Sequence, residues 1–121
     1  MDLTTAEENY LKAIYHLSDG GKKSVSTNDI AAEIKTKAAS VSDMLRQLGE
    51  KEVIEYRTYY GLQITALGKR HALQTIRKHR LWEVFLVDKL NFAWDEVHEV
   101  AEQLEHIHST LLIQRLDSYL N

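Results

Sequence analysis

Imidazole and carboxylate side chains recur at helical spacing in residues 95–106 of this sequence. If the segment is a helix, its apolar residues gather on one side, and they are Val97, Val100, Ala101, Leu104 and Ile107. The flank of that side carries His98, Glu102, Glu105 and His106. A second pair, His79 and Glu83, stands at i, i+4 in the segment expected to be the preceding helix. These nitrogen and oxygen donors suit a divalent first-row metal such as Mn²⁺, Fe²⁺ or Zn²⁺.

Other interpretations of these residues have to be weighed. His and Glu at i, i+4 on one helix usually form a solvated surface, so neither pair predicts a metal site by itself. His98-Glu99 resembles the start of the zinc-protease motif HExxH, but Glu102 stands in place of the second His and excludes that motif. A metal-dependent hydrolase is further disfavoured because the sequence lacks a nucleophile motif and a Gly-rich phosphate loop. We therefore expect that the protein is not an enzyme.

Composition limits the remaining classes. The chain has 121 residues, of which 44% are hydrophobic, enough for a core, and no Cys, which excludes disulfides and thiolate ligands. It has no signal-peptide pattern and no apolar run long enough to span a membrane, so we expect a cytoplasmic protein. The net charge of −3 arises after residue 70, where 5 Lys and Arg face 8 Asp and Glu. The basic balance typical of nucleic-acid binding is absent, but a bound dication would cancel two negative charges.

The first 70 residues predict three short helices. Thr5 and Glu8 have the spacing of a capping box for a first helix that ends near Ser18. A second helix begins at Ser26, and a third covers residues 40–48 after a brief connection. The last two predict a helix-turn-helix.

A β-hairpin is predicted directly after these helices. Residues 53–57 and 62–65 have β-type composition and flank a turn at 58–61. A helix-turn-helix followed by a hairpin is a winged helix, a DNA-binding arrangement. Arg57, Tyr59 and Tyr60 of the wing suit contact with phosphate and sugar, although we expect at least one of the tyrosines to pack against the hairpin.

Three further helices are predicted in the rest of the chain. A long helix capped by Thr65 runs from Ala66 to about Leu90 and tolerates Gly68, a second starts at Asp95, and Ser109 caps the last. Their apolar residues exceed what a core of this size needs, which favours a dimer face. We therefore predict a mainly α fold: a winged helix-turn-helix DNA-binding domain over residues 1–70, then an all-helical dimerisation and metal-binding domain over residues 71–121.

The whole chain resembles the DtxR/MntR family of diphtheria-toxin-repressor-like, metal-dependent transcriptional repressors. The resemblance begins at residues 5–15, which read TAEENYLKAIY. Its most specific parts are residues 62–69, 77–86 and 97–106, which read LQITALGK, RKHRLWEVFL and VHEVAEQLEH. The last two at this separation are a strong signal.

The resemblance implies two metal sites. One uses the positions of His79, Glu83 and His98, and the other uses those of Glu102, Glu105 and His106 with one group from the first helix, at Asn9. The family's iron-responsive branch has Cys at the position of Glu102 and Met in the first helix, whereas the manganese branch has Glu and Asp. This chain follows the manganese branch at Glu102 and neither branch at Asn9, and Lys12 replaces a second carboxylate of the manganese branch. The sulfur-free set favours Mn²⁺, with Fe²⁺ next, whereas Zn²⁺ and other divalent transition metals are expected to bind in vitro.

DNA contacts are also implied. Family base contacts cluster at the positions of Ala39, Ser40, Ser42 and Asp43, and Asp43 can accept a hydrogen bond from cytosine N4. We expect the whole DNA-binding set to be Thr27, Asn28, Lys37, Ala39, Ser40, Ser42, Asp43, Arg46 and Arg57, with Lys69 as a further candidate for backbone contact.

The expected function is therefore a homodimeric repressor of metal-homeostasis genes, activated by Mn²⁺ or Fe²⁺ and bound to a palindromic double-stranded DNA operator. We expect neither a membrane partner nor a small-molecule substrate. An SH3-like C-terminal domain, found in many family members, is expected to be absent. The alternative is a metal-independent winged-helix regulator in which the carboxylate–histidine stripe is structural.

Overall fold

A computed structural model describes residues 2–57, 59 and 61–121 of the chain. Within these residues the chain forms six α-helices and one two-stranded antiparallel sheet. It divides into two compact units, Met1–Leu73 and Gln74–Asn121. None of the helices in the described part of the chain combines the length and the apolar character that crossing a membrane requires.

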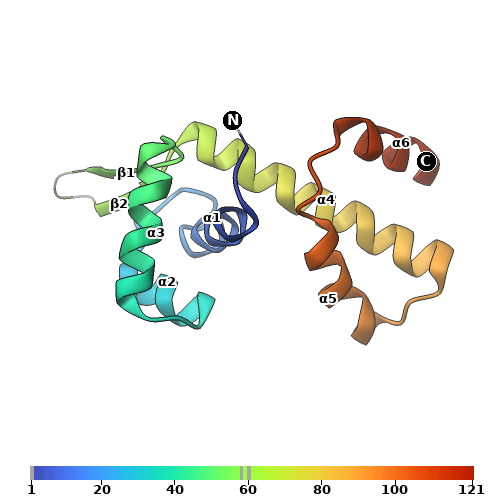
Figure 1. Cartoon of the computed structure of the whole chain (residues 1–121), viewed down its shortest axis with the longest axis horizontal. Helices are drawn as coiled ribbons and strands as arrows, with labels where there is room; N and C mark the ends of the chain where they lie inside the picture. The colour runs from blue at the N-terminus through green and yellow to red at the C-terminus, as the bar shows by residue number, and fades with distance from the viewer. Residues whose placement is uncertain (1, 58, 60) are drawn as a thin grey trace. The chain divides into compact units, whose positions relative to one another are not determined.

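Three helices pack together in the first unit, and they are α1 (Thr5–Leu17), α2 (Thr27–Ile34) and α3 (Ala38–Glu50) (Figure 1). Ser26 caps α2 as predicted, because its side chain accepts from the Asp29 N–H. The capping box of α1, however, joins Thr4 to Glu7, so the prediction of Thr5 and Glu8 was wrong by one residue. Helix α3 begins two residues before the predicted residue 40.

The predicted hairpin follows α3 and consists of β1 (Ile54–Arg57) and β2 (Gly61–Ile64). Ile54 pairs with Ile64 and Arg57 with Gly61. A short bridge between Val25 and Leu62 joins the loop after α1 to the edge of β2. Tyr59 is 99% exposed and does not pack against the hairpin, whereas Thr58 and Tyr60 of the predicted turn lie outside the described residues.

An ion pair between a buried carboxylate and a partly exposed lysine accompanies the apolar core of the first unit. The core draws on all three helices and both strands and includes Leu11, Ile14, Ile30, Val41, Leu48 and Leu62. Beside it, Lys51 Nζ lies 2.6 Å from Oε1 of the buried Glu7. Burial alone would raise the pKa of the Glu7 carboxyl, but the hydrogen bonds from Lys51 and the Thr4 N–H outweigh burial and lower that pKa below its ordinary value.

Helix α4 (Ala66–Leu90) has the predicted bounds. Thr65 caps it, because the Gly68 N–H donates to Thr65 Oγ1 at 3.0 Å. Gly68 was predicted only to be tolerated, but the structure requires a glycine at this position. A Cβ there would collide with the Val53 carbonyl oxygen and would lie 2.8 Å from Ile64 Cγ1. The start of α4 therefore needs a residue without a side chain where it crosses the hairpin.

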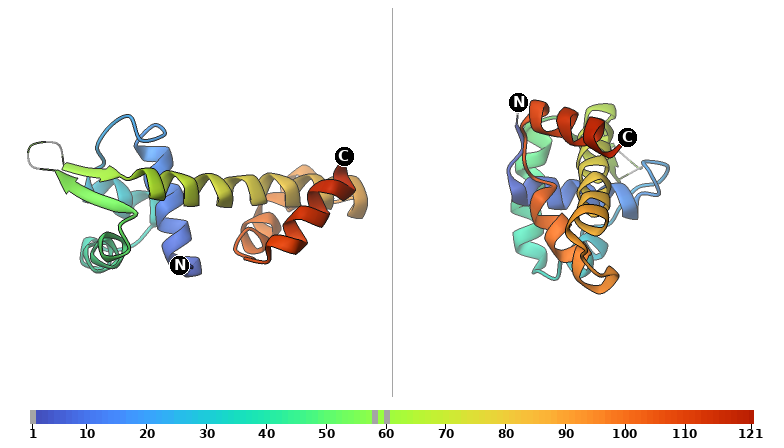
Figure 2. Two further views of the ribbon diagram at one scale, coloured as in Figure 1. Left: turned by 90° about the horizontal axis from the view of Figure 1, so that it is seen from above. Right: turned by 90° about the vertical axis from the view of Figure 1, so that its right-hand side faces the viewer.

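In the second unit, α5 (Trp94–Leu104) and α6 (Thr110–Leu120) lie against the C-terminal half of α4 (Figure 2). Their shared core consists of Trp82, Leu86, Val97, Ala101, Ile113 and Leu116. Ser109 caps α6 as predicted. The prediction of one helix through His106 was wrong, because α5 ends at Leu104 and Glu105 is its C-cap.

Candidate metal centre and DNA-binding surface

Three predicted ligands from two helices come together in the second unit. His79 and Glu83 are one turn apart on α4, and His98 stands on the facing α5. One ligand atom from each of the three lies within 4.8 Å of the others. Glu83 Oε2 is the shared point, 3.2 Å from His79 Nε2 and 3.8 Å from His98 Nδ1.

The remaining nitrogen of each imidazole contacts a carboxylate of the second predicted set. His79 Nδ1 lies 2.7 Å from Glu105 Oε1, and His98 Nε2 lies 2.8 Å from Glu102 Oε1. The other nitrogens, His79 Nε2 and His98 Nδ1, face Glu83, so each nitrogen of both rings lies beside a carboxylate. A metal bound through His79 Nε2 and His98 Nδ1 would leave the ring N–H of each histidine on the nitrogen that faces Glu105 or Glu102.

Burial differs sharply across this network. Glu105 is fully buried, whereas the side chain of His98 is 67% exposed. The second oxygen of Glu105 lies 3.7 Å from His106 Nε2, so one buried carboxylate stands between two histidines. The sequence analysis named Glu105 as a ligand of the second site but missed its contact with His79. That contact depends on how α5 ends, and no local pattern reveals it.

These side chains fit a first-row dication. Two atoms bound to one ion at about 2.1 Å lie about 3.0–3.4 Å apart at tetrahedral or octahedral angles. The 3.2 Å separation between Glu83 and His79 already lies in that range, and the 3.8 Å separation between Glu83 and His98 needs only a small adjustment. A histidine that binds a metal through one nitrogen and a carboxylate through the other is the usual arrangement in metal sites.

Asn9, the remaining predicted ligand, belongs to the first unit. It is exposed on α1, and Lys12 is half-buried one turn later. The place of Asn9 in a ligand set stays a prediction from the family resemblance.

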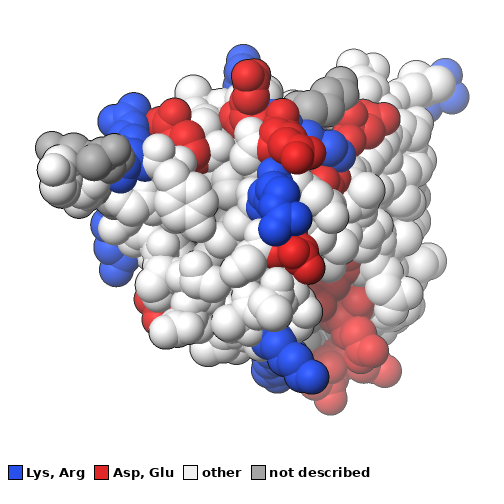
Figure 3. All heavy atoms as spheres, turned by 60° about the vertical axis from the view of Figure 1, so that its left-hand side comes forward, with Lys and Arg blue, Asp and Glu red and all other residues white. Residues whose placement is uncertain are grey.

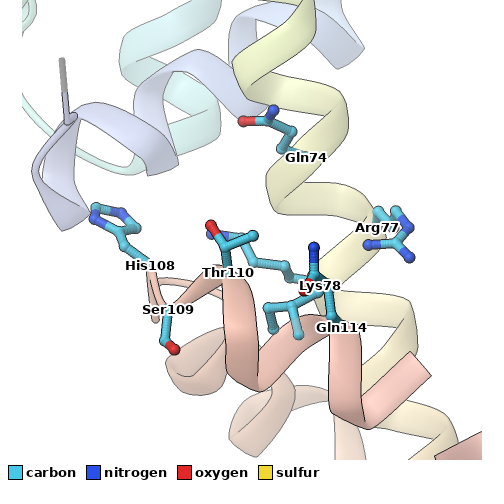
Figure 4. Close-up of a pocket in the computed structure, with 8 residues that line it drawn as sticks. Gln74, Arg77, Lys78, His108, Ser109, Thr110 and Gln114 are labelled. Carbon is cyan, nitrogen blue, oxygen red and sulfur yellow. The ribbon is translucent and has the colours of Figure 1, made fainter. Parts of the chain in front are cut away.

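A basic hollow of the second unit contains none of the predicted ligands among its lining residues (Figure 4). It has a volume of about 300 Å³ and lies between α4 and the start of α6. Its two cations are already engaged: Arg77 pairs with Asp117 at 3.0 Å, and Lys78 Nζ donates to the Ile107 carbonyl oxygen at 3.1 Å. This hollow is therefore separate from the candidate metal centre.

The predicted DNA-binding residues lie at the surface of the first unit. All are exposed except the half-buried Thr27, and they come from α2, from α3 with its N-cap Lys37, and from the end of β1. The buried side of α3, with Val41, Leu45 and Leu48, faces the core, so its opposite side presents Ser42, Asp43 and Arg46. Lys69, the further candidate, is half-buried near the start of α4.

Asp43 has a cation beside it. Arg46 NH2 lies 3.4 Å from Asp43 Oδ1, and both side chains are largely exposed. The pair reduces the repulsion that an isolated Asp43 would exert on phosphate. On the face drawn in Figure 3, basic side chains alternate with acidic ones and form no continuous basic surface.

Two family models together match nearly the whole chain. The N-terminal DNA-binding domain of iron-dependent repressors matches residues 2–62, and their metal-binding and dimerisation domain matches residues 65–121. The predicted mainly α fold and family resemblance are thereby confirmed.

Individual relatives agree with these models. The iron-dependent repressor IdeR of Mycobacterium leprae is 32% identical over 99% of this chain and 52% of its own. Among solved structures, the manganese regulator SloR is 39% identical with a TM-score of 0.83, over 98% of this chain and 55% of its own. A manganese-dependent transcriptional repressor in complex with manganese is 38% identical with a TM-score of 0.80, over 94% of this chain and 52% of its own. The chain thus spans about half the length of these relatives.

Proposed function

We propose that this chain, which belongs to the iron-dependent repressor family, is a metal-dependent transcriptional repressor that binds operator DNA as a homodimer. The observation that carries the proposal is the convergence of His79 Nε2 and His98 Nδ1 on Glu83. A solvated helix surface would not need two imidazoles from different helices aimed at one carboxylate, with their other nitrogens on Glu105 and Glu102.

The activating ion in this proposal is Mn²⁺ or, second, Fe²⁺. The chain contains no Cys, and the predicted set has only imidazole, carboxylate and amide donors. Such hard and intermediate ligands suit Mn²⁺ and Fe²⁺ in cells, although Zn²⁺ binds more tightly to most N/O sites in vitro. The compared relatives include both iron-dependent and manganese-dependent repressors, which supports this pair of metals.

Glu102, Glu105 and His106 have two roles in the proposal. Toward His79 and His98, the two carboxylates fix the orientation of the imidazole rings, as outer carboxylates do in metal sites. The family resemblance also makes these three residues, with Asn9, the ligands of a second ion. We retain Asn9 as a proposed ligand, weaker than Asp because its carbonyl oxygen is neutral.

A bound dication would act in two ways: through its positive charge, and by binding more tightly to one conformational state than to the other. It would supply positive charge to the part of the chain where acidic residues outnumber basic ones by 8 to 5. Lower net negative charge weakens repulsion from DNA phosphate. Repression further requires that the metal bind more tightly to the DNA-competent state, because equal affinity for both states would shift nothing.

The DNA-binding surface is assigned to residues 1–70, and dimerisation with metal binding to residues 71–121. In this proposal the exposed start of α3 reads base edges, while Lys37, Arg46 and Arg57 contact phosphates. Two copies related by twofold symmetry would bind the two halves of a palindromic operator. The regulated genes would be those of metal homeostasis, and the protein would act in the cytoplasm.

The test begins with selection of binding sites from random DNA in the presence of Mn²⁺. Fluorescence anisotropy then measures affinity for the selected site without metal, with Mn²⁺, and with Fe²⁺ under anaerobic conditions. We expect palindromic sites and a gain in affinity with metal that disappears when chelator is added. Equal affinity with and without metal would contradict the proposal and would reduce the metal centre to a structural network.

A further inference from the structure

We propose that a basic patch beside the wing binds phosphates of the DNA backbone, away from the bases that α3 contacts. The patch, called here the wing patch, consists of Lys22, Lys23, Arg57 and Tyr59. These residues line a hollow of about 350 Å³ together with Ser24 and Gln63. The inference rests on the proposed DNA-binding function and adds two lysines that neither the sequence analysis nor the family resemblance had named.

The loop that carries the two lysines is held firmly at its start. The N–H groups of Gly21, Lys22 and Lys23 all donate to the carbonyl oxygen of the buried Ser18, at 3.2, 2.8 and 3.0 Å. The Gly21 N–H also lies 2.9 Å from Ser18 Oγ. Gly21 has a φ of +93°, which an L side chain rarely adopts, so the sharp turn before Lys22 depends on glycine.

The same loop is held at its end by the sheet. The Val25 N–H donates to the Leu62 carbonyl oxygen at 3.2 Å, which places the loop along the edge of β2. Lys22, Lys23 and Ser24 therefore stand between two anchors and next to the wing. Arg57 and Tyr59 could be predicted from the sequence because they belong to the hairpin. The lysines could not, because the bridge between Val25 and Leu62 is a contact between distant residues.

The charge of the wing patch is positive. Three of the six lining residues are cations and none is a carboxylate. Arg57 shares its charge with Glu55, whose Oε1 lies 3.0 Å from Arg57 Nε. Both lysines are exposed, and no ion pair to a carboxylate is found for either within the described residues. The Nζ of Lys69 lies close to Gly21 at the start of this loop, since a Cβ built on Gly21 would be 2.9 Å from it. Lys69 therefore adds to the positive charge.

The chemistry of these groups suits phosphate rather than base edges. Lysine ammonium, arginine guanidinium and the hydroxyl and amide groups of Ser, Tyr and Gln are the usual donors to phosphate and sugar oxygens. Lysine is a flexible point charge that recognises phosphate without a fixed geometry. The wing patch should therefore add affinity to every DNA sequence and little discrimination among sequences.

The test compares the wild-type chain with the double variant Lys22→Gln/Lys23→Gln on the selected operator and on unrelated DNA. Affinity is measured in Mn²⁺ over a range of salt concentrations. Losing two phosphate contacts in each subunit, four in the dimer, should reduce the slope of log K against log salt by about 3.6, and should weaken binding roughly 100-fold or more near 0.1 M salt. The loss should be the same factor on both DNAs, and the gain in affinity on adding Mn²⁺ should stay unchanged.

Two further variants serve as controls. Lys89→Gln/Arg115→Gln removes the same charge from exposed positions of the second unit and should leave the salt slope unchanged. Lys22→Arg/Lys23→Arg keeps the charge and should keep the slope. Thermal unfolding would check that each variant folds.

Each outcome decides a separate point. If the wild-type chain binds DNA and Lys22→Gln/Lys23→Gln has the wild-type slope, the wing patch is overturned while the proposed function stands. If the double variant loses affinity for the operator alone, its lysines read bases, and the backbone role is overturned. If the wild-type chain binds no DNA with Mn²⁺, the proposed function fails, and this inference fails with it.

Discussion

Glu105 is the residue on which the metal centre depends most. Its carboxylate is fully buried, with one oxygen 2.7 Å from His79 Nδ1 and the other 3.7 Å from His106 Nε2. A buried carboxylate is costly unless it has partners, so this residue is retained against a desolvation penalty. Holding the His79 ring in a fixed orientation explains why an acidic side chain stands there.

Glu105→Gln keeps the size of the side chain and removes its negative charge. We expect the affinity for Mn²⁺ to decrease about 10- to 100-fold, because the outer partner of a metal-binding histidine sets its orientation and basicity. Competition with a chelating dye measures this affinity. Glu99→Gln, at an exposed position of α5, is the matched control and should change it little. Wild-type affinity in Glu105→Gln would contradict the role assigned to Glu105.

Lys51 is the residue that keeps Glu7 charged inside the first unit. In metal-free protein at pH 7, Lys51→Met should lower the free energy of unfolding by about 1–3 kcal/mol, because it leaves a buried carboxylate without its cation. Chemical denaturation measures the difference between wild type and variant.

The pH dependence of that difference has a definite sign. Burial alone would raise the pKa of Glu7 in the folded state, but the hydrogen bonds from Lys51 and Thr4 outweigh burial, so the pKa is lowered. The pair therefore stabilises the fold above the ordinary pKa of Glu, about 4.3, and this stabilisation is lost as the pH falls through the folded pKa. A difference that stayed constant down to about pH 2 would argue against this assignment.

At the scale of elements, the start of α4 shows how closely the helix approaches the hairpin. Gly68→Ala should lower the free energy of unfolding by about 1–3 kcal/mol or more, because the added methyl group would collide with the Val53 carbonyl oxygen. Gly49→Ala in α3 is the control. A Cβ there meets nothing within 4 Å, so the change should stabilise the chain by about 0.5–1 kcal/mol. Thermal unfolding of both variants tests the contrast, and equal effects would refute it.

The bounds of several elements could be predicted from local chemistry. Ser26, Thr65 and Ser109 each precede an apolar helical pattern, and each caps a helix in the structure. The N-terminus of α1 was ambiguous, because Thr4 and Thr5 are each followed three residues later by Glu. The contact of Glu7 with Lys51 is consistent with the choice of Thr4, and that contact joins residues far apart in the chain.

The candidate site was predictable in membership but not in arrangement. The resemblance to the DtxR/MntR family placed His79, Glu83 and His98 in one site, whereas their spacing indicated only that each helix offers candidate ligands on one side. The end of α5 at Leu104 could not be predicted from the sequence, because residues 105 and 106 continue the helical pattern. Glu105 is the C-cap of α5, and its carboxylate contacts His79 of α4. This is a contact between distant residues, so local spacing does not reveal it.

At the scale of the whole molecule, dimerisation needs an apolar surface, and Trp94 is the most exposed large apolar side chain of the second unit, at 81%. Trp94→Glu should shift the chain from dimer to monomer, because an aromatic anchor is replaced by a charge. Glu is acceptable in the first turn of α5, so the helix should persist. Analytical ultracentrifugation measures the association, and Gln103→Glu, which adds the same charge at an exposed position, is the control. A dimer as stable as wild type would exclude Trp94 from the interface.

Metal binding and DNA binding are expected to be coupled in this protein. Coupling is reciprocal, so Mn²⁺ must tighten DNA binding by the same factor by which DNA tightens Mn²⁺ binding. A metal that is bound without a role in DNA binding would change neither affinity.

The most direct test is the ratio of DNA dissociation constants without and with saturating Mn²⁺, measured for the wild-type chain and for His79→Ala/His98→Ala. We predict a ratio of about 5–150 for the wild type, a typical range for allosteric coupling. The variant should still bind DNA weakly, with a ratio near 1. A wild-type ratio of 1, or an equal gain in the variant, would contradict the claim that these two histidines make the repressor metal-dependent.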